Sequence, residues 1–237
     1  EIKIYYLLKS KLKKVKKDKI LIIAAHPDDE ILGCGGTIIK LKEHNEINVL
    51  FMSDGVASRG RNKKKEIKER KNSCLKLFKY LSLPKPIFFN FPDNQMDKIP
   101  LLKIIKKIEK KIKILKPTTI FTHYSHCLNI DHRITFEAVV TACRPINKIS
   151  VKRILSFEVP SSTDWALFKG KSFQPNYFVD ISKNLKEKIN LVNFYKKELR
   201  NYPHSRSINS IKSLASTRGV SCGVKYAEGF YINRWIE

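Results

Sequence analysis

The sequence lacks any hydrophobic run long enough to cross a membrane. Its apolar stretches fall well short of the roughly 18 residues that a membrane-spanning helix needs. Segment 1–19 is too rich in lysine, and its apolar part too short, for a secretory signal. The five cysteines are odd in number and form no C-x-x-C pair, which argues against a disulfide framework. We therefore expect a cytoplasmic protein with reduced thiols and no transmembrane segment.

Arginine is scarce among the basic residues. The net charge is +25, from 47 Lys and Arg against 22 Asp and Glu, but only ten of the 47 are Arg and the lysines spread along the whole chain. A protein that reads base edges is expected to use arginine. The charge therefore indicates a lysine-biased solvated surface, and we expect no nucleic-acid partner. The positive field would still favour an anionic substrate, such as a nucleotide-linked or phosphate-bearing sugar.

Apolar runs and amphipathic stretches alternate along the chain, as in α/β proteins. We expect strands at 20–25, 47–52, 87–91, 119–122, 154–159, 177–181 and 226–232. We expect helices at 37–44, 63–81, 101–115, 134–143, 185–199 and 210–217. This order predicts a mainly parallel sheet flanked by helices. No repeat or linker divides the chain, so we expect a single domain over 1–237, with a basic lead-in at 1–19 and a mobile loop at 56–62; a homo-oligomer remains open.

The first expected strand ends abruptly in His26-Pro27-Asp28-Asp29-Glu30. Proline has no N–H for the sheet, so the strand stops there. In open α/β sheets, the carboxyl edge of the strands is where ligands bind. A histidine beside three acids in an apolar setting is costly without a cation, and histidine with carboxylate is a common zinc ligand pair. A solvated acidic loop is the alternative.

A second polar cluster follows the strand at 119–122 and runs from His123 to His132. It would emerge at the same edge of the sheet as His26. Asp131 adjoins His132, and a carboxylate that orients a ligating histidine is a common second-shell arrangement. His132 is therefore a candidate ligand, whereas His123 and His126 could equally be exposed loop residues.

Together these stretches resemble a known family. Ala25-His26-Pro27-Asp28-Asp29-Glu30, then Gly35-Gly36-Thr37, then Asn129-Ile130-Asp131-His132, are similar to the PIG-L/LmbE family of zinc-dependent N-deacetylases. The similarity runs from about residue 20 to the C-terminus. The resemblance implies a Rossmann-like α/β domain that removes acetyl from N-acetylglucosamine-type sugar conjugates.

The resemblance also implies roles for particular residues. His26, Asp29 and His132 match the family's zinc ligands, Asp28 matches its general base, and Asp131 matches the acid beside the third ligand. Three protein ligands leave a coordination place for water, as catalytic zinc requires, although another divalent ion could take the site.

Other residues match the family's substrate groups, or depart from them. Arg70 and Asp93 match residues that contact the sugar, although a solvated helix charge and a turn former are the alternatives. Asn129 stands where relatives have a histidine that helps hold the oxyanion, so His123 or His126 could substitute. His204 and Arg206 could roof the pocket, or merely shape a loop. Cys127 occupies a place where close relatives have Asp, and its role is open.

Two other functions use the same features. Two histidines and one carboxylate also form the facial triad of non-haem iron enzymes, which usually have β-rich folds. A basic nucleic-acid-binding module with a vestigial acidic cluster would instead show salt-dependent DNA affinity and bind no metal. The intact set of His26, Asp28, Asp29 and His132 favours a metal-dependent deacetylase.

Overall fold

A computed structural model describes residues 17–56, 63–146, 150–167 and 172–237. Most of the expected lead-in and of the loop at 56–62 lie outside these residues. The strands are β1 (Lys19–Ala24), β2 (Glu46–Ser53), β3 (Ile87–Phe91), β4 (Thr119–His123), β5 (Arg153–Phe157), β6 (Tyr177–Asp180) and β7 (Ala227–Trp235). The helices are α2 (Asp29–Leu41), α3 (Lys63–Tyr80), α4 (Leu101–Leu115), α5 (Ile130–Ala142), α6 (Leu185–Val192) and α7 (Ile208–Val220), with short 3₁₀ helices η1 (Met96–Lys98) and η3 (Asn193–Glu198).

The strands form one sheet in the order β3-β2-β1-β4-β5-β7-β6. Strands β1 to β5 pair in parallel, and β7 runs antiparallel to both β5 and β6. The predicted mainly parallel α/β sheet is thus confirmed. The chain moves outward from β1 in one direction through β2 and in the other through β4, so the strand order reverses between β1 and β4. This is the switch point at which open α/β sheets place their ligands.

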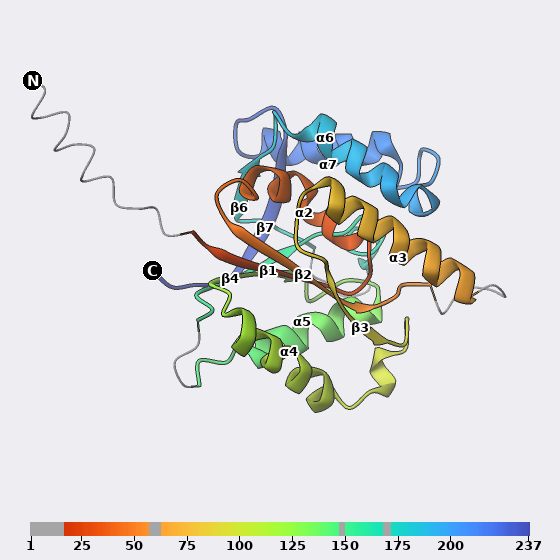
Figure 1. Ribbon diagram of the computed structural model, residues 1–237. Coiled ribbons are helices and arrows are strands. Elements are labelled where there is room, and N and C mark those ends of the chain that lie inside the picture. The colour runs from red at the N-terminus through yellow and green to blue at the C-terminus, as the bar shows by residue number, and fades with distance from the viewer. Residues whose placement is uncertain (1–16, 57–62, 147–149, 168–171) are drawn as a thin grey trace, which may run out of the picture.

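Helices cover both faces of the sheet (Figure 1). Helices α2, α3, α6 and α7 lie on one face, and α4 and α5 pack together on the other. Each side has its own apolar core, one around β1, α2 and α6, the other around α4 and α5. Successive side chains of a strand point to opposite faces of the sheet, so Ile20 and Ile22 of β1 enter the first core and Leu21 and Ile23 enter the second.

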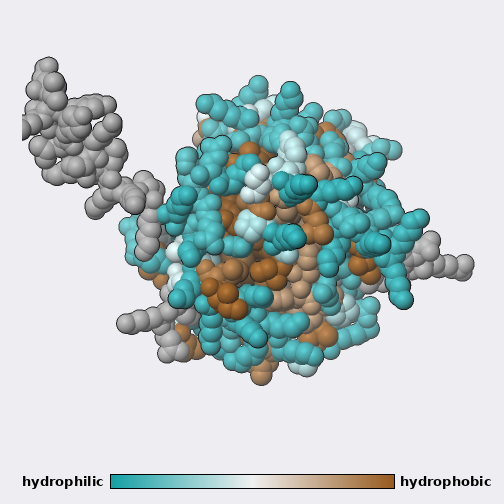
Figure 2. Space-filling view, viewed as in Figure 1, coloured by the Kyte–Doolittle hydropathy of each residue, from teal (hydrophilic) through white to brown (hydrophobic). Residues whose placement is uncertain are grey.

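The surface on the side shown in Figure 2 is mostly hydrophilic, with apolar side chains gathered near its middle. Lysines cover part of the aromatic edge strand β3, because Lys71 lies over the ring of Phe88 and Lys107 over those of Phe89 and Phe91. No helix in the described part of the chain is both long and apolar enough to span a bilayer.

Two helices begin at least four residues earlier than the sequence predicts. Helix α2 starts at Asp29 rather than at 37, so the glycines expected before the helix lie inside it. They allow close approach: a Cβ on Gly33 would lie 2.4 Å from the ring of Phe157, and one on Gly36 would lie 2.7 Å from Ile181. Helix α5 likewise starts at Ile130 rather than at 134. Both early starts bring motif residues into the first helical turn.

The helix expected over 185–199 is also shorter than predicted. Helix α6 ends at Val192, and the 3₁₀ helix η3 continues the chain to Glu198 with a kink at Tyr195. This change of direction places Tyr195 and Glu198 beside the start of α2, where the candidate site lies.

Candidate metal centre

The two predicted polar clusters meet at the switch point of the sheet. His26 follows the end of β1, and Asp29 opens α2. His132 lies in the first turn of α5, shortly after β4 ends. Because β1 and β4 are parallel neighbours, both turns leave the sheet at the same edge. The fold thus brings together residues more than 100 positions apart.

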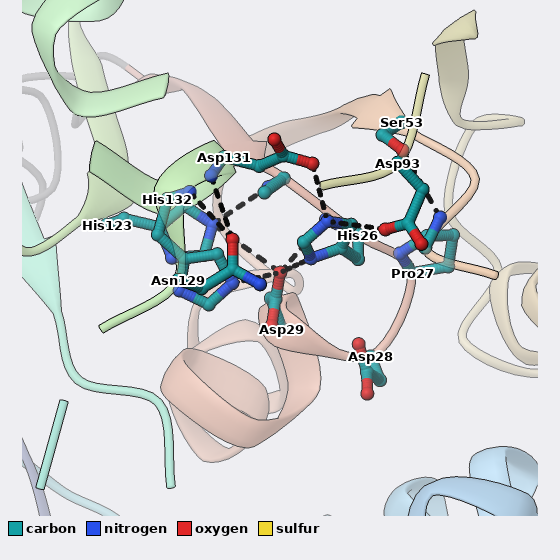
Figure 3. Close-up of polar contacts among 12 residues, drawn as sticks. His26, Pro27, Asp28, Asp29, Ser53, Asp93, His123, Asn129, Asp131 and His132 are labelled. Carbon is teal, nitrogen blue, oxygen red and sulfur yellow. Dashed lines mark hydrogen bonds and ion pairs between the residues drawn. The ribbon is translucent and has the colours of Figure 1, made fainter. Parts of the chain in front are cut away.

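His26, Asp29 and His132 form the candidate metal cluster (Figure 3). Asp29 Oδ2 lies 3.3 Å from His26 Nδ1 and 3.3 Å from His132 Nε2. One ligand atom from each of the three residues lies within 4.8 Å of the others, and all three residues are buried. The predicted ligand set is therefore assembled in space.

The donor set fits a divalent cation. Asp29 Oδ1 is buried and accepts no hydrogen bond from the described residues. A buried carboxylate oxygen left in this state is costly unless a ligand takes it. Two imidazoles and a carboxylate are a common ligand set for zinc, and they leave a position open for water or substrate.

His26 is oriented by carboxylates behind its ring. Its Nε2 lies 3.1 Å from Asp131 Oδ2 and 3.2 Å from Asp93 Oδ1. Burial acts to lower the pKa of His26, but hydrogen bonds to Asp131, Asp29 and Asp93 outweigh it and hold that pKa well above the usual value. A carboxylate on the outer nitrogen fixes the ring and makes the inner nitrogen a better ligand.

Asp131 occupies a different place from the one its sequence position suggests. Its carboxylate contacts His26 rather than the adjacent His132, and it accepts hydrogen bonds from the backbone N–H of Asn94 at 2.7 Å and of Met96 at 3.2 Å. Asp131 thus ties the loop after β3 to the histidine after β1. Asp93, predicted to hold sugar hydroxyls, faces the same nitrogen of His26.

Asp28 lies outside the cluster, and no hydrogen bond or ion pair joins its side chain to the other labelled residues of Figure 3. Its φ of 133° is strained for a residue with a side chain, and such strain tends to gather at functional sites. The carboxylate of Glu30 accepts the Asp28 N–H at 2.9 Å and the hydroxyl of Tyr195 at 2.8 Å. Burial raises the pKa of Glu30 to about 8. Glu30 therefore holds the backbone of Asp28 in its strained conformation.

Two arginines form ion pairs with the Asp28 carboxylate. Arg70 Nη2 lies 2.7 Å from Oδ1, and Arg206 Nη1 lies 3.1 Å from Oδ2. Glu198 contacts both guanidinium groups, at 3.1 Å and 3.7 Å, which closes a ring of two acids and two arginines. Burial raises the pKa of Asp28, and the two arginines counteract this shift. The carboxylate is thus fixed in place in a mostly buried setting.

The remaining predicted substrate residues have structural partners. Arg70 is buried and donates to the carbonyls of Pro27 at 2.8 Å and Gly55 at 2.7 Å. Asn129 caps α5, because its Oδ1 accepts the N–H of Asp131 at 2.8 Å, while its Nδ2 donates to Asn94 at 2.9 Å. The side chain that replaces the family's oxyanion histidine therefore serves the helix start.

The other histidines lie around this centre in different ways. His123 Nε2 accepts the N–H of Ala25 at 2.8 Å, so this nitrogen carries no proton, and burial holds the pKa of His123 well below its usual value. This arrangement leaves His123 neutral and stacked on His132, with ring centroids 3.8 Å apart. His126 contacts Ser125 Oγ at 2.7 Å, and His204 Nδ1 accepts the N–H of Arg206 at 3.0 Å.

Cys127 belongs to the wall of the site. Its Sγ lies 3.2 Å from the hydroxyl of Thr163, and it stands in one group with His123 and His132. Burial raises the pKa of the Cys127 thiol to about 12. The group of His26, Asp29 and His132 includes the predicted ligands and the buried Asp29 Oδ1, which has no hydrogen-bond partner among the described residues.

Nothing in the sequence predicted Glu198 as a site residue, the contact between Glu30 and Tyr195, or the contact of Arg206 with Asp28. Glu198 lies within a stretch with the pattern of an amphipathic helix, and Arg206 reaches Asp28 across 178 positions of sequence. The exposed face of that stretch carries several charges, so nothing local marked Glu198. The sequence features closest to these residues were the acidic motif that contains Glu30 and the polar turn at 201–207 that contains Arg206.

A sheet with its switch point at β1 and β4, and a buried candidate metal cluster there, are typical of α/β proteins that place a ligand site at the sheet edge. The model of one family, PIG-L: GlcNAc-PI de-N-acetylase, matches residues 21–143. The chain belongs to this family, which confirms the predicted resemblance.

Relatives and solved structures agree with this membership. The chain is 27% identical over 164 residues, 67% of this chain and 82% of the relative, to the uncharacterized deacetylase YaiS of Escherichia coli (strain K12). It is 26% identical to the diacetylchitobiose deacetylase of Thermococcus kodakarensis, over 89% of this chain and 81% of that protein. The structure of N,N'-diacetylchitobiose deacetylase from Pyrococcus horikoshii, with an inhibitor, matches with a TM-score of 0.72 at 22% identity, over 96% of this chain and 89% of that one. At that identity, the structural match supports the fold.

Proposed function

We propose that this protein is a zinc-dependent hydrolase that removes the acetyl group from an N-acetylglucosamine-type sugar conjugate. The observation that carries the proposal is the convergence of the buried His26, Asp29 and His132 at the switch point of the sheet, with Asp28 directly before Asp29 in the same motif. The relative named diacetylchitobiose deacetylase supports an acetylated amino sugar as the substrate.

His26, Asp29 and His132 would hold the zinc ion, which when bound supplies an activated water and polarises the acetamide carbonyl. Asp28 would accept the proton of the attacking water as general base. It would then return this proton to the nitrogen as the C–N bond breaks, so that acetate and a free amine leave. Arg70 and Arg206 keep the carboxylate in one orientation through both transfers.

The first test is elemental analysis of the purified protein together with acetate release from N-acetylglucosamine conjugates. We expect one equivalent of zinc and release of acetate. One equivalent of iron with oxidation instead of acetate release would favour the non-haem iron alternative. Absence of metal after reconstitution would overturn the proposal.

Asp28→Asn tests the general base. The variant keeps the shape of the side chain and should bind zinc at wild-type stoichiometry, but acetate release should fall by about 10²–10⁴-fold. Asp97→Asn is the matched control, because Asp97 lies exposed in η1. Normal turnover by Asp28→Asn would remove Asp28 from the role of base.

A further inference from the structure

A groove of about 520 Å³ lies on the surface between the loop that follows β5 and the start and outer face of α7. Its size falls within the range of about 300–1,000 Å³ that is usual for ligand sites. The residues that line it include Glu158, Thr163, Asp164, Trp165 and Tyr202.

The groove adjoins the candidate metal centre on two sides. Arg206 joins its wall to Asp28, because its Nε contacts the Pro160 carbonyl at 3.3 Å and Ser161 Oγ at 2.9 Å while its Nη1 contacts Asp28. On the other side, Thr163 of the lining contacts Cys127, which stands in one group with His132. A molecule bound in the groove would therefore extend from the place where the acetyl group must lie.

The groove carries two exposed aromatic rings. Trp165 is 47% exposed and Tyr202 is 70% exposed, and Trp165 packs edge-on against His204 with ring centroids 4.9 Å apart. Leaving a large aromatic ring in water forgoes the free energy of its burial, so a ring on the wall of a groove beside a site indicates a ligand surface. The hydroxyl-bearing residues Ser210, Ser213 and Thr217 also line the groove.

The charge of the lining selects among ligands. Among the described residues, those that line the groove include the acids Glu158 and Asp164 and neither lysine nor arginine. Arg218 neutralises Glu158 through two hydrogen bonds of 2.6 and 2.7 Å. In a chain of net charge +25, this lining thus offers no lysine or arginine of its own to hold an anionic group. Aromatic rings with hydroxyl groups suit the apolar face and polar edge of a neutral sugar ring.

We propose that this groove binds the second, neutral saccharide ring of the substrate, with Trp165 and Tyr202 as its stacking surface. The proposal rests on the proposed function, since it places the N-acetylated ring at the metal centre. It replaces the expectation of an anionic conjugate with that of a neutral oligosaccharide.

The two tryptophans of the chain provide a matched pair of variants. Trp235 is 42% exposed and lies on β7 against Tyr177 and Arg153, so it resembles Trp165 in exposure but is absent from the groove lining. In Trp235→Phe the only tryptophan is Trp165, and in Trp165→Phe it is Trp235. We expect the deacetylated disaccharide to change the fluorescence of the first variant and not of the second.

Kinetics give the second measurement. Trp165→Ala should raise KM for N,N'-diacetylchitobiose about tenfold, as expected for the loss of one stacked ring, with kcat almost unchanged. The same variant should deacetylate monomeric N-acetylglucosamine within about twofold of wild type, because one ring does not reach the groove. Trp235→Ala should match wild type with both substrates.

The outcomes separate this proposal from the proposed function. A fluorescence response of Trp165 to the disaccharide, without acetate release from any sugar, would keep the groove and overturn the deacetylase. Acetate release with no fluorescence response, and with equal KM values for wild type and Trp165→Ala, would overturn the groove alone. Tighter binding of N-acetylglucosamine 1-phosphate than of the neutral disaccharide would also overturn it.

Discussion

Two clusters of buried charged side chains lie along helix α2, and they differ in how their polar atoms are satisfied. The candidate metal cluster of His26, Asp29 and His132 lies at the start of the helix. A second cluster lies at its middle, where Glu228 of β7 and Lys188 of α6 meet; we call this the Glu228 cluster. Both are nearly inaccessible to solvent.

The Glu228 cluster is complete. The carboxylate of Glu228 accepts hydrogen bonds from the N–H groups of Gly36 and Thr37, from the hydroxyl of Thr37 and from Lys188 Nζ. Lys188 also donates to the carbonyl of Leu32 at 2.9 Å. These contacts bridge the kink at Cys34, where α2 departs from helical angles. A buried ion pair with all its hydrogen bonds made is a structural feature.

The candidate metal cluster is incomplete without a cation. Several carboxylates surround His26, and Asp29 Oδ1 has no hydrogen-bond partner among the described residues. The contrast shows how to separate a structural charge cluster from a functional one in the same helix: the structural cluster satisfies its own atoms, whereas the functional cluster leaves one for a ligand. We therefore expect that disrupting the candidate metal cluster lowers activity, whereas disrupting the Glu228 cluster lowers stability.

Removing the central carboxylate should have the largest effect on activity. Asp29→Ala takes away the one oxygen that faces both His26 and His132. We expect zinc content to fall below a tenth of an equivalent and acetate release to fall by more than about 10³-fold, because the metal supplies the activated water. The measurements are elemental analysis and an acetate assay. Full zinc occupancy in this variant would overturn the ligand assignment, and exposed Asp97→Ala serves as the control.

Breaking the Glu228 cluster should instead reduce stability. Glu228→Ala leaves Lys188 charged and buried without its carboxylate, which should lower the free energy of unfolding by about 3–5 kcal/mol. Zinc stoichiometry of the folded variant should stay at one equivalent. Denaturant unfolding measures the effect, and Glu109→Ala, which removes a surface ion pair with Lys106, should remain within about 0.5 kcal/mol of wild type.

A double variant sharpens this second comparison. Lys188→Met combined with Glu228→Gln removes both charges, so it should recover part of the stability that Glu228→Ala loses. Equal losses in the single and double variants would show that the unpaired lysine is not the source of the cost. Loss of zinc in either folded variant would mean that the two clusters are coupled through α2.

Much of the fold could be predicted from local pattern. The strand at 87–91 and the helix at 101–115 have the predicted bounds, because proline fixes their flanks and the apolar spacing is regular. The start of α2 was missed because Gly33, Gly35 and Gly36 have poor helix propensity. Their close contacts with the sheet decide their conformation, and tertiary contacts are invisible in a local pattern.

The candidate site, like the fold, could be predicted from the sequence in part. The motif at 25–30 and the pair Asp131-His132 fall together because parallel neighbouring strands end at one edge. The ring of Arg70, Glu198 and Arg206 around Asp28 was not predictable as a unit, since two of its contacts join residues 128 and 178 positions apart. A residue that orients another residue has no local sequence pattern that marks this role. The residues of a short motif can be recognised together.

The smallest expected effect concerns the cap that starts α5 beneath His132. Asn129→Ala removes the acceptor for the N–H groups of Asp131 and His132, and the loss of such a cap costs about 1 kcal/mol. Asn129→Ser keeps a cap acceptor but loses the contact with Asn94, so it should cost less. Denaturant unfolding of the two variants separates the cap from that contact. Because Asn129 touches the helix start rather than Asp29, both variants should keep one equivalent of zinc; loss of zinc in Asn129→Ala alone would show that the cap positions His132 for the metal.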